Sequence, residues 1–297
     1  LHIEYSLTPT PYIQVNTTLL EPSCLVGNNP ASDTFTITNT GTAILNYSLT
    51  DDQDWVTLSS NGGVLSVGAT TVITVNYTAS VMVRGSYDAI IRIEDTGASP
   101  LAPNSPVDIN VTLEIQVPTV EVSVSANSDD AEEGESGAMD LYSSDLELIT
   151  ESTDQIVGIR FQNVAVPQGA MITNAYLEFD VDEDVNTNPT NLDIYAEAAD
   201  NPGTFISTAN NISNRDRTAQ FTSWDNLPNW NMGEQHQTPD LSSVVQAIIG
   251  RTGWASGNAM VFIITGSGKR IAESHDGDGA PPLLHIEYQV GSFPNIS

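Results

Sequence analysis

The sequence is a succession of short runs in which polar and apolar residues alternate. Residues 33–39 and 44–49 are two such runs, and Thr40, Gly41 and Thr42 between them supply a turn. Because side chains on a strand point alternately to opposite faces of a sheet, this period of two predicts strands with one buried face. The sequence therefore predicts an all-β protein.

A first series of alternating runs extends over residues 12–117. Its further runs lie at residues 64–67, 71–77, 87–94 and 107–117. Runs at intervals of about 8–12 residues, punctuated by Gly, Asn, Asp and Pro, are typical of an immunoglobulin-like sandwich. We expect such a sandwich over residues 12–118.

Four ordered motifs in this series resemble the immunoglobulin-like sandwich of the BACON type. They are FTITNTG (35–41), DWVTL (54–58), GGVL (62–65) and GSYDAIIRI (85–93). The resemblance implies that Trp55 anchors the core and that Gly85 forms the turn before the penultimate strand. It also implies a spacer in a secreted multidomain protein, of the kind often found beside carbohydrate-active domains.

A second series of runs follows Pro118 and Thr119, and we expect a second sandwich over residues 119–290. Its predicted strands lie at residues 141–142, 146–149, 156–161, 172–181, 192–198, 219–221, 259–265 and 283–288. The short boundary between the two series indicates a stiff pair of domains.

One segment of the second series has a helical period instead. Thr238 is the predicted cap, Pro239 occupies the first helical position, and Asp240 lies in the first turn. Apolar residues then recur at positions 241, 244, 245, 248 and 249. We predict a short helix that covers an open end of the sandwich and ends at Gly250 or Gly253.

Five motifs of the second series are similar to the DNRLRE-type jelly rolls, which are relatives of carbohydrate-binding modules. They are SDDAEE (128–133), VGIRF (157–161), PQGAMITNAYL (167–177), GWASGNA (253–259) and APPLLHIEY (280–288). The resemblance implies a jelly roll with one short helix, so that the fold is two tandem β-sandwiches. It does not assign binding residues.

Charge and motif content exclude several functions. Eight basic residues against 38 acidic residues give a net charge of −30, which repels nucleic acid and anionic lipid. The sequence has no apolar run long enough to span a membrane. Cys24 is the only cysteine, which excludes an intrachain disulfide, and motifs of nucleophilic or zinc-dependent catalysis are missing. We therefore predict that the chain is not an enzyme.

Two acidic segments, residues 129–133 and 276–278, predict a Ca²⁺ site. Carboxylates packed this closely repel one another without a cation, and Ca²⁺ takes six to eight oxygen ligands. A solvated acidic turn is the alternative in so acidic a chain. The first segment follows the first strand of the second series and the other precedes its last strand. A jelly roll brings these two strands close together, so the segments could share one ion or each hold one. The predicted ligands are Asp129, Asp130, Glu132, Glu133, Asp276 and Asp278.

Two further sets of residues suggest contact with sugars. Trp224 and Trp230 flank a loop-like segment and are candidate sugar-stacking platforms, although buried loop anchors are the commoner fate of such residues. Six Asn-x-Ser/Thr sequons are also present, and in a chain rich in Thr and Asn such triplets arise by chance as well. They begin at Asn16, Asn46, Asn76, Asn110, Asn211 and Asn295.

A pentapeptide occurs once near each end of the sequence. Leu1, His2, Ile3, Glu4 and Tyr5 recur as Leu284, His285, Ile286, Glu287 and Tyr288. The second copy is the predicted last strand of the jelly roll, so we expect the first copy to complete the sheet of a neighbouring unit. Residues 1–11 are then a strand and connector, and residues 291–297 begin the next connector.

Such head-to-tail contacts do not close, and they generate fibres. The array could be covalent, as one period of a longer protein, or non-covalent, by strand addition between copies. We therefore predict a repeat unit of an extracellular or cell-surface fibre, stalk or adhesin, with further copies of the chain as partners. The alternative is a non-catalytic carbohydrate-binding region of a secreted enzyme, with glycans as partners.

Overall fold

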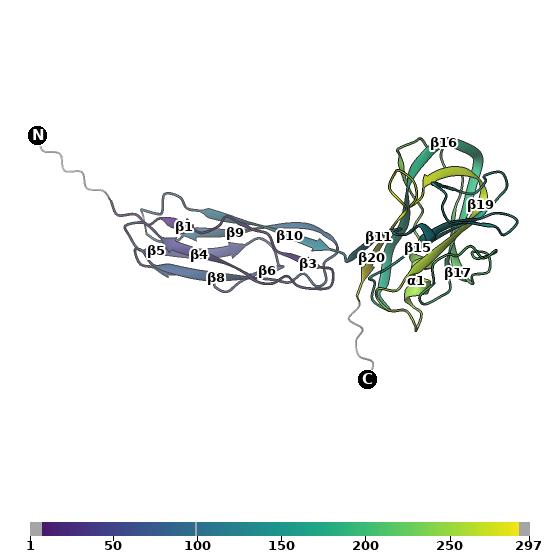
Figure 1. Ribbon diagram of the computed structural model, residues 1–297. Coiled ribbons are helices and arrows are strands. Elements are labelled where there is room, and N and C mark those ends of the chain that lie inside the picture. Colours follow the sequence, from purple (N-terminus) through teal and green to yellow (C-terminus); the bar gives the residue numbers. More distant parts are fainter. Residues whose placement is uncertain (1–7, 99, 291–297) are drawn as a thin grey trace, which may run out of the picture. The chain divides into compact units, whose positions relative to one another are not determined.

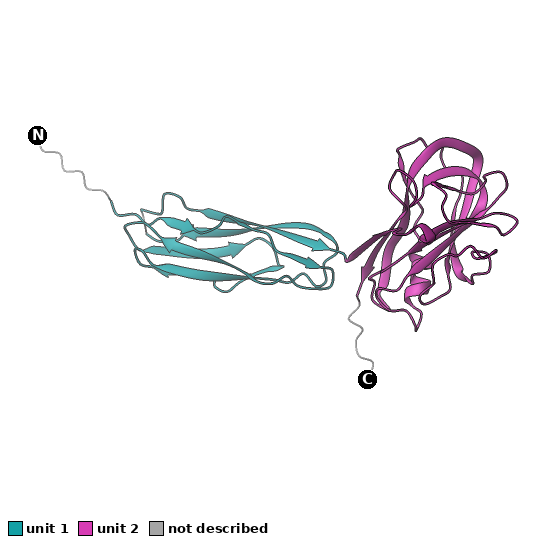
Figure 2. Cartoon of the chain, viewed as in Figure 1, with its two compact units in different colours: residues 1–117 teal, residues 118–297 magenta. Residues whose placement is uncertain are grey.

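The computed structural model describes residues 8–98 and 100–290. The chain divides into two compact units, residues 1–117 (unit 1) and residues 118–297 (unit 2), which Figure 2 shows in separate colours. The division lies where Pro118 and Thr119 separate the two series of alternating runs. Each unit is described by itself below.

Unit 1 consists of two sheets (Figure 1). The first has the order β1-β4-β8-β6, and the second has the order β2-β10-β9-β5-β7 with β3 also paired to β10. The strands are β1 (Ile13–Val15), β2 (Leu19–Leu20), β3 (Ser23–Leu25), β4 (Asp33–Asn39), β5 (Leu45–Asp51), β6 (Val56–Leu58), β7 (Gly62–Leu65), β8 (Thr70–Tyr77), β9 (Gly85–Asp95) and β10 (Val107–Gln116).

Alternation in the sequence becomes alternation of burial in these strands. In β4, Phe35 and Ile37 are buried while the threonines between them are partly exposed. The inward side chains of both sheets form one apolar cluster, which is the core of a sandwich. Trp55 is partly buried against this core and lies 6.2 Å from Tyr77, ring centre to ring centre.

Unit 2 is built around two long strands, β16 (Met171–Glu197) and β19 (Met260–Glu273). The first part of β16 pairs with β20 and β18, and its last part pairs with β17 and β19. The remaining elements are β11 (Thr119–Ser123), a 3₁₀ turn (Asn127–Asp129), β12 (Asp130–Glu133), β13 (Met139–Asp140), β14 (Asp145–Glu147), β15 (Ile156–Phe161), β17 (Arg217–Trp224), β18 (Gln235–Gln237), α1 (Ser242–Ile249) and β20 (Leu283–Gln289).

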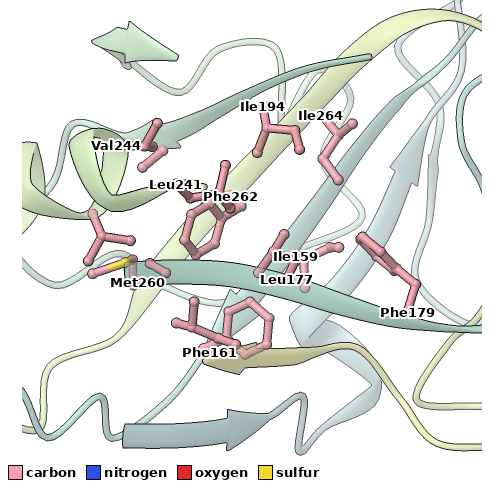
Figure 3. Packing of buried hydrophobic residues seen from close by; sticks show 14 of the residues in the cluster. Ile159, Phe161, Leu177, Phe179, Ile194, Leu241, Val244, Met260, Phe262 and Ile264 are labelled. Atoms are coloured by element: carbon pink, nitrogen blue, oxygen red, sulfur yellow. The ribbon is translucent and has the colours of Figure 1, made fainter. Parts of the chain in front are cut away.

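The main core of unit 2 lies between the two parts of β16. Leu177 and Phe179 come from its first part and Ile194 from its last part, and Figure 3 shows them beside residues of β15 and β19. Phe161 and Phe262 pack edge to face with ring centres 5.9 Å apart. The same strand thus contributes to both sides of one core.

Helix α1 begins later than the sequence indicates. Its N-cap is Leu241 rather than Thr238, because the backbone N–H groups of Thr238 and Leu241 donate to Leu177 and Ala175 and so hold this stretch against β16. The carboxylate of Asp240 still accepts the backbone N–H of Ser242 at 2.8 Å. The helix ends at Ile249 with Gly250 as its C-cap.

The predicted all-β class is confirmed. Strands and their turns form both units, and α1 packs its buried face into the main core of unit 2. The sequence nevertheless predicts separate strands at residues 172–181 and 192–198, whereas the structure has the continuous β16. Within the described residues, no helix is long and apolar enough to cross a membrane.

Candidate metal centre in unit 2

Asp129 is committed to an ion pair inside unit 2. Its Oδ1 atom accepts hydrogen bonds from Arg160 Nη1 at 2.7 Å and from Thr204 Oγ1 at 2.8 Å. Its Oδ2 atom accepts from Gln162 Nε2 at 2.6 Å. The side chain is almost completely buried, and the guanidinium supplies its counter-charge. Asp129 therefore anchors the structure and is a poor candidate for a metal ligand.

Glu133 is likewise occupied by backbone donors. Its Oε2 atom accepts the N–H groups of Ile212 at 2.7 Å and Ser213 at 2.9 Å. Strand β12 points this side chain to the opposite face from Asp130 and Glu132, because successive residues alternate. The sequence groups these carboxylates, but the strand separates them.

Glu132 and Glu147 form a buried carboxyl pair that borders a pocket of 340 Å³. Glu132 Oε1 accepts from the backbone N–H of Glu147 at 2.7 Å and from Gln155 Nε2 at 2.6 Å. Burial, and next the negative charge of Glu147, raise the pKa of Glu132 to about 9. Burial also raises the pKa of Glu147, whose Oε1 atom lies 3.8 Å from Lys269 Nζ. At neutral pH the pair therefore retains a proton.

Asp130 lies beside the second predicted acidic segment, residues 276–278. Its Oδ2 atom accepts the backbone N–H of His275 at 2.7 Å. Burial, and to a smaller extent the nearby charge of Asp276, raises the pKa of Asp130 to about 6. Among the described residues, the buried Asp276 Oδ2 atom has no hydrogen-bond partner. The two acidic segments are thus brought together here.

The densest group of carboxylates consists of residues that the sequence did not single out. One carboxylate oxygen each from Asp145, Asp182 and Glu183 lies within 4.8 Å of the other two. Asp145 belongs to β14 and pairs with Glu273 of β19, whereas Asp182 and Glu183 belong to β16. No local spacing signals this group, because its members come from distant parts of the sequence.

Further carboxylates lie near this group. Burial raises the pKa of Asp182, and the negative charges of Glu273, Asp145 and Asp278 raise it further. Mutual repulsion of this kind favours either protonation or a bound cation. We call Asp145, Asp182, Glu183, Glu273 and Asp278 the carboxylate cluster.

A glycine-containing loop encloses one member of the carboxylate cluster. A Cβ atom on Gly277 would collide with Glu273 Oε2 and with the Ser144 carbonyl oxygen. A Cβ on Gly279 would lie 2.6 Å from Glu273 Oε1. Glu273 Oε2 is buried and has no hydrogen-bond partner among the described residues. Carboxylate and carbonyl oxygens that lack donors are the ligands Ca²⁺ prefers, so this donor set fits a calcium ion.

The two candidate sugar platforms are buried, which corrects the expectation of surface indoles. Trp230 is 0% exposed and Trp224 is 9% exposed. The segment between them folds back on β16, where the backbone N–H of Trp230 donates to Asn186 Oδ1 at 2.8 Å. Trp230 also stacks on His236 with ring centres 4.8 Å apart. Neither tryptophan presents a face to a sugar.

The predicted assembly strand, Leu1, His2, Ile3, Glu4 and Tyr5, lies outside the described residues. Its second copy forms most of β20, which is paired on both sides, with β11 and with β16. Leu284 and Ile286 are fully buried. The His285 ring stacks on Tyr176 at 4.5 Å, and its Nδ1 atom lies 3.0 Å from Glu121 Oε1.

Comparisons with known proteins concern mainly unit 1. The sequence profile of the viral BACON domain matches residues 21–102, which confirms the BACON-type resemblance for that part of the chain. A search of curated proteins found no match. The predicted resemblance of residues 119–290 to DNRLRE-type jelly rolls stays a prediction.

Several solved structures align with a part of this chain. A Bacteroides ovatus GH5 xyloglucanase is 15% identical, with a TM-score of 0.27, over 39% of this chain and 20% of the enzyme. The PapD-like domain 7 of human CEP192 is 13% identical, with a TM-score of 0.28, over 39% of this chain and 92% of that domain. The E. coli chaperone DraB is 8% identical, with a TM-score of 0.30, over 56% of this chain and 74% of DraB. The chain spans about a fifth of the xyloglucanase.

Proposed function

We propose that the chain is a non-catalytic structural unit of an extracellular or cell-surface fibre, in which unit 2 is stiffened by Ca²⁺. The observation that carries this proposal is the carboxylate cluster, in which side chains of β14, β16 and β19 converge with the loop before β20. Among the described residues, no lysine or arginine forms an ion pair with it as Arg160 does with Asp129. A divalent cation bound there ties these elements together in the folded state.

Removal of calcium tests this proposal. A ligand that binds only the folded state stabilises it by about 2.7 kcal/mol at a free concentration near 100 times its Kd. We expect EGTA to lower the melting temperature of unit 2 by several degrees and to leave that of unit 1 unchanged. Equal melting curves with and without calcium, and no bound ion by mass spectrometry, would reject the calcium site.

A matched pair of variants locates the ion. Asp182→Asn removes a ligand from the carboxylate cluster, whereas Asp225→Asn removes an exposed carboxylate elsewhere in unit 2. We expect the first variant to lose the calcium-dependent shift and the second to keep it. Loss of the shift in Asp129→Asn but not in Asp182→Asn would return the site to the residues expected from the sequence.

Head-to-tail pairing through Leu1–Tyr5 is the second part of the proposal. It is supported by the environment of the identical sequence in β20, where every residue from Leu284 to Glu287 lies between two neighbouring strands. A sequence with this pattern leaves apolar side chains exposed when it is unpaired. Deletion of residues 1–5 should abolish assembly, measured by sedimentation and electron microscopy, and leave both melting transitions intact.

The carbohydrate-binding alternative loses the two residues on which it depended, because Trp224 and Trp230 are buried. A hydrolytic role finds little support in the Glu132–Glu147 pair. Glycosidases hold two carboxyl groups about 5–10 Å apart around a substrate, whereas these two carboxyl groups hydrogen-bond to each other. The weak likenesses to glycoside hydrolases do not decide the question.

A further inference from the structure

Three of the sequons of unit 1 lie within strands. Asn46, Asn76 and Asn110 belong to β5, β8 and β10, respectively. Because a strand has a period of two, the hydroxyl residue two positions later emerges on the same face as the asparagine. The residue between them points into the core: Tyr47, Tyr77 and Val111 are all buried. The asparagine and the hydroxyl residue of each acceptor triplet therefore lie on the outer face.

Three other asparagines of unit 1 form side-chain hydrogen bonds that account for their presence. Asn39 Nδ2 donates to the carbonyl oxygens of Ala43 and Leu65. Asn104 Oδ1 accepts the backbone N–H of Ile13, and Asn104 Nδ2 donates to the carbonyl oxygen of the same residue. Asn29 Oδ1 accepts two backbone N–H groups. Each of these side chains compensates a backbone group, and none of the three begins a sequon.

The three asparagines that begin sequons within strands lack such hydrogen bonds in the described residues. Among the described residues, no side-chain hydrogen bond is found for Asn46, Asn76 or Asn110. Asparagine is depleted in strands, where β-branched residues pack better. The amide of Asn46 lies near the turn at Gly97, since a Cβ atom on Gly97 would lie 3.3 Å from Asn46 Nδ2. In the described part of unit 1, these three side chains therefore do not bind backbone groups as Asn29, Asn39 and Asn104 do.

Exposed aliphatic side chains surround two of these asparagines. Val64 lies directly opposite Asn46 on β7 and is 65% exposed, and Ile44, two residues before Asn46, is 58% exposed. Residues directly opposite on paired strands have Cβ atoms about 5 Å apart. These two side chains form an apolar surface beside Asn46 against which the C–H face of a sugar ring can pack.

Asn110 has the same type of surroundings on a different strand. It lies between Ile90 of β9 and Leu19 of β2, which are 39% and 46% exposed. The hydroxyl of its sequon, Thr112 Oγ1, donates to Asp88 Oδ1 at 3.0 Å. Asn76, by contrast, lies opposite Thr57 and has no aliphatic residue directly across from it on β6.

The geometry points to N-linked glycosylation of unit 1 at Asn46 and Asn110, with the first sugar rings lying over the aliphatic residues beside each asparagine. In this modification the side-chain amide nitrogen attacks the anomeric carbon of an oligosaccharide carried on a polyprenyl pyrophosphate. The C–N bond forms, the carbon–phosphate oxygen bond breaks, the amide proton passes to a base of the transferase, and the lipid pyrophosphate leaves with the bonding electrons.

A glycan at each site would cover the exposed aliphatic side chains beside it. The C–H faces of a sugar ring can lie against Val64 and Ile44, or against Ile90 and Leu19, while its hydroxyl groups remain in water. Each glycan also blocks the outer face of its sheet against contact with another sheet. Unit 1 is then a glycan-bearing spacer, a role independent of the calcium site in unit 2.

Glycopeptide mass spectrometry of the protein from its natural source tests the inference. We expect sugar masses on peptides that contain Asn46 and Asn110, and none on peptides that contain Asn29, Asn39 or Asn104. Unmodified Asn46 and Asn110 would overturn the inference. Glycans confined to Asn16 and Asn76 would overturn it as well, because those sites lack the paired aliphatic neighbours.

Variants secreted from a glycosylating host provide a second measurement. Thr112→Ser keeps the sequon and should keep the glycan, whereas Thr112→Val should remove one glycan mass from the intact protein. Asn46→Gln should remove another. The double variant Asn46→Gln/Thr112→Val should bind more of an apolar dye than the glycosylated protein, and equal dye binding would refute the proposed covering of the aliphatic residues.

Discussion

The two units bury different kinds of side chain. The buried polar side chains of unit 1 among the described residues are Asn39 and Asp95, and each meets backbone groups. Unit 2 buries several carboxylates, including Asp129, Asp130 and Glu132. Unit 1 therefore depends on apolar packing, whereas unit 2 also depends on what neutralises its acids. The comparison predicts that the units respond to different perturbations.

Buried carboxylates are costly because they lose their hydration. Unit 2 compensates them in three ways: Arg160 pairs with Asp129, backbone N–H groups bind Glu133, and Glu132 keeps a proton. Among the described residues, the carboxylate cluster has no basic side chain paired with it, and for this reason we propose a cation there. Separate measurement of the two units distinguishes these contributions.

Removal of a core aromatic residue from unit 1 should have the largest effect. Phe35→Ala empties a fully buried position between the sheets and should cost about 3–5 kcal/mol. Calorimetry should show a lower melting temperature for unit 1 and an unchanged transition for unit 2. Val72→Ala, at an exposed position, is the control. A simultaneous shift of both transitions would contradict the independence of the units.

Removal of a counter-charge from unit 2 should have a slightly smaller effect. Arg160→Met leaves Asp129 buried without its partner, which should cost about 3 kcal/mol. The transition of unit 2 should move and that of unit 1 should not. The double variant Asp129→Asn/Arg160→Met should regain part of the loss, because the unpaired charge is gone. If the double variant is no more stable than Arg160→Met, charge is not the cause.

The retained proton of Glu132 should give unit 2 a pH dependence that unit 1 lacks. Its pKa is raised from 4.5 to about 9, so the protonated form stabilises the fold. That stabilisation is complete below pH 4.5 and is lost as the pH rises through about 9. Melting in EGTA should therefore show a fall of several degrees for unit 2 across this range.

Glu132→Gln tests the origin of that slope. The amide keeps the acceptor for Gln155 and the backbone of Glu147 but cannot ionise. We expect this variant to melt higher than the wild type at pH 9 and to show a flatter profile. Glu135→Gln, at an exposed position, should retain the wild-type slope. A slope that persists in Glu132→Gln would assign the pH dependence to another group.

The smallest effect is expected for the surface ion pair of unit 1. Arg92 donates to Asp108 through two nitrogen atoms, at 2.8 and 2.9 Å, but both side chains are substantially exposed. Exposed pairs are screened by water and salt. Arg92→Met should leave the melting temperature of unit 1 unchanged within error. A clear decrease, removable by salt, would show that unit 1 also depends on charge.

The sequence by itself determined the strands wherever alternation was unbroken. The predicted runs at residues 33–39 and 71–77 correspond to β4 and β8 (Thr70–Tyr77) with at most one residue of difference. Each such strand has one buried face, and the period of two records that face directly. Alternation fails between residues 182 and 190, where β16 continues through exposed side chains, so the sequence divided one strand into two.

Only the tertiary structure decided which acids meet. Asp129, Asp130, Glu132 and Glu133 are neighbours in sequence, but a strand sends successive side chains to opposite faces and the fold gives each a different partner. The carboxylate cluster instead joins β14, β16 and β19 through strand pairing. Spacing along the chain reports which face a residue occupies; which other residues share that place depends on the pairing of distant strands.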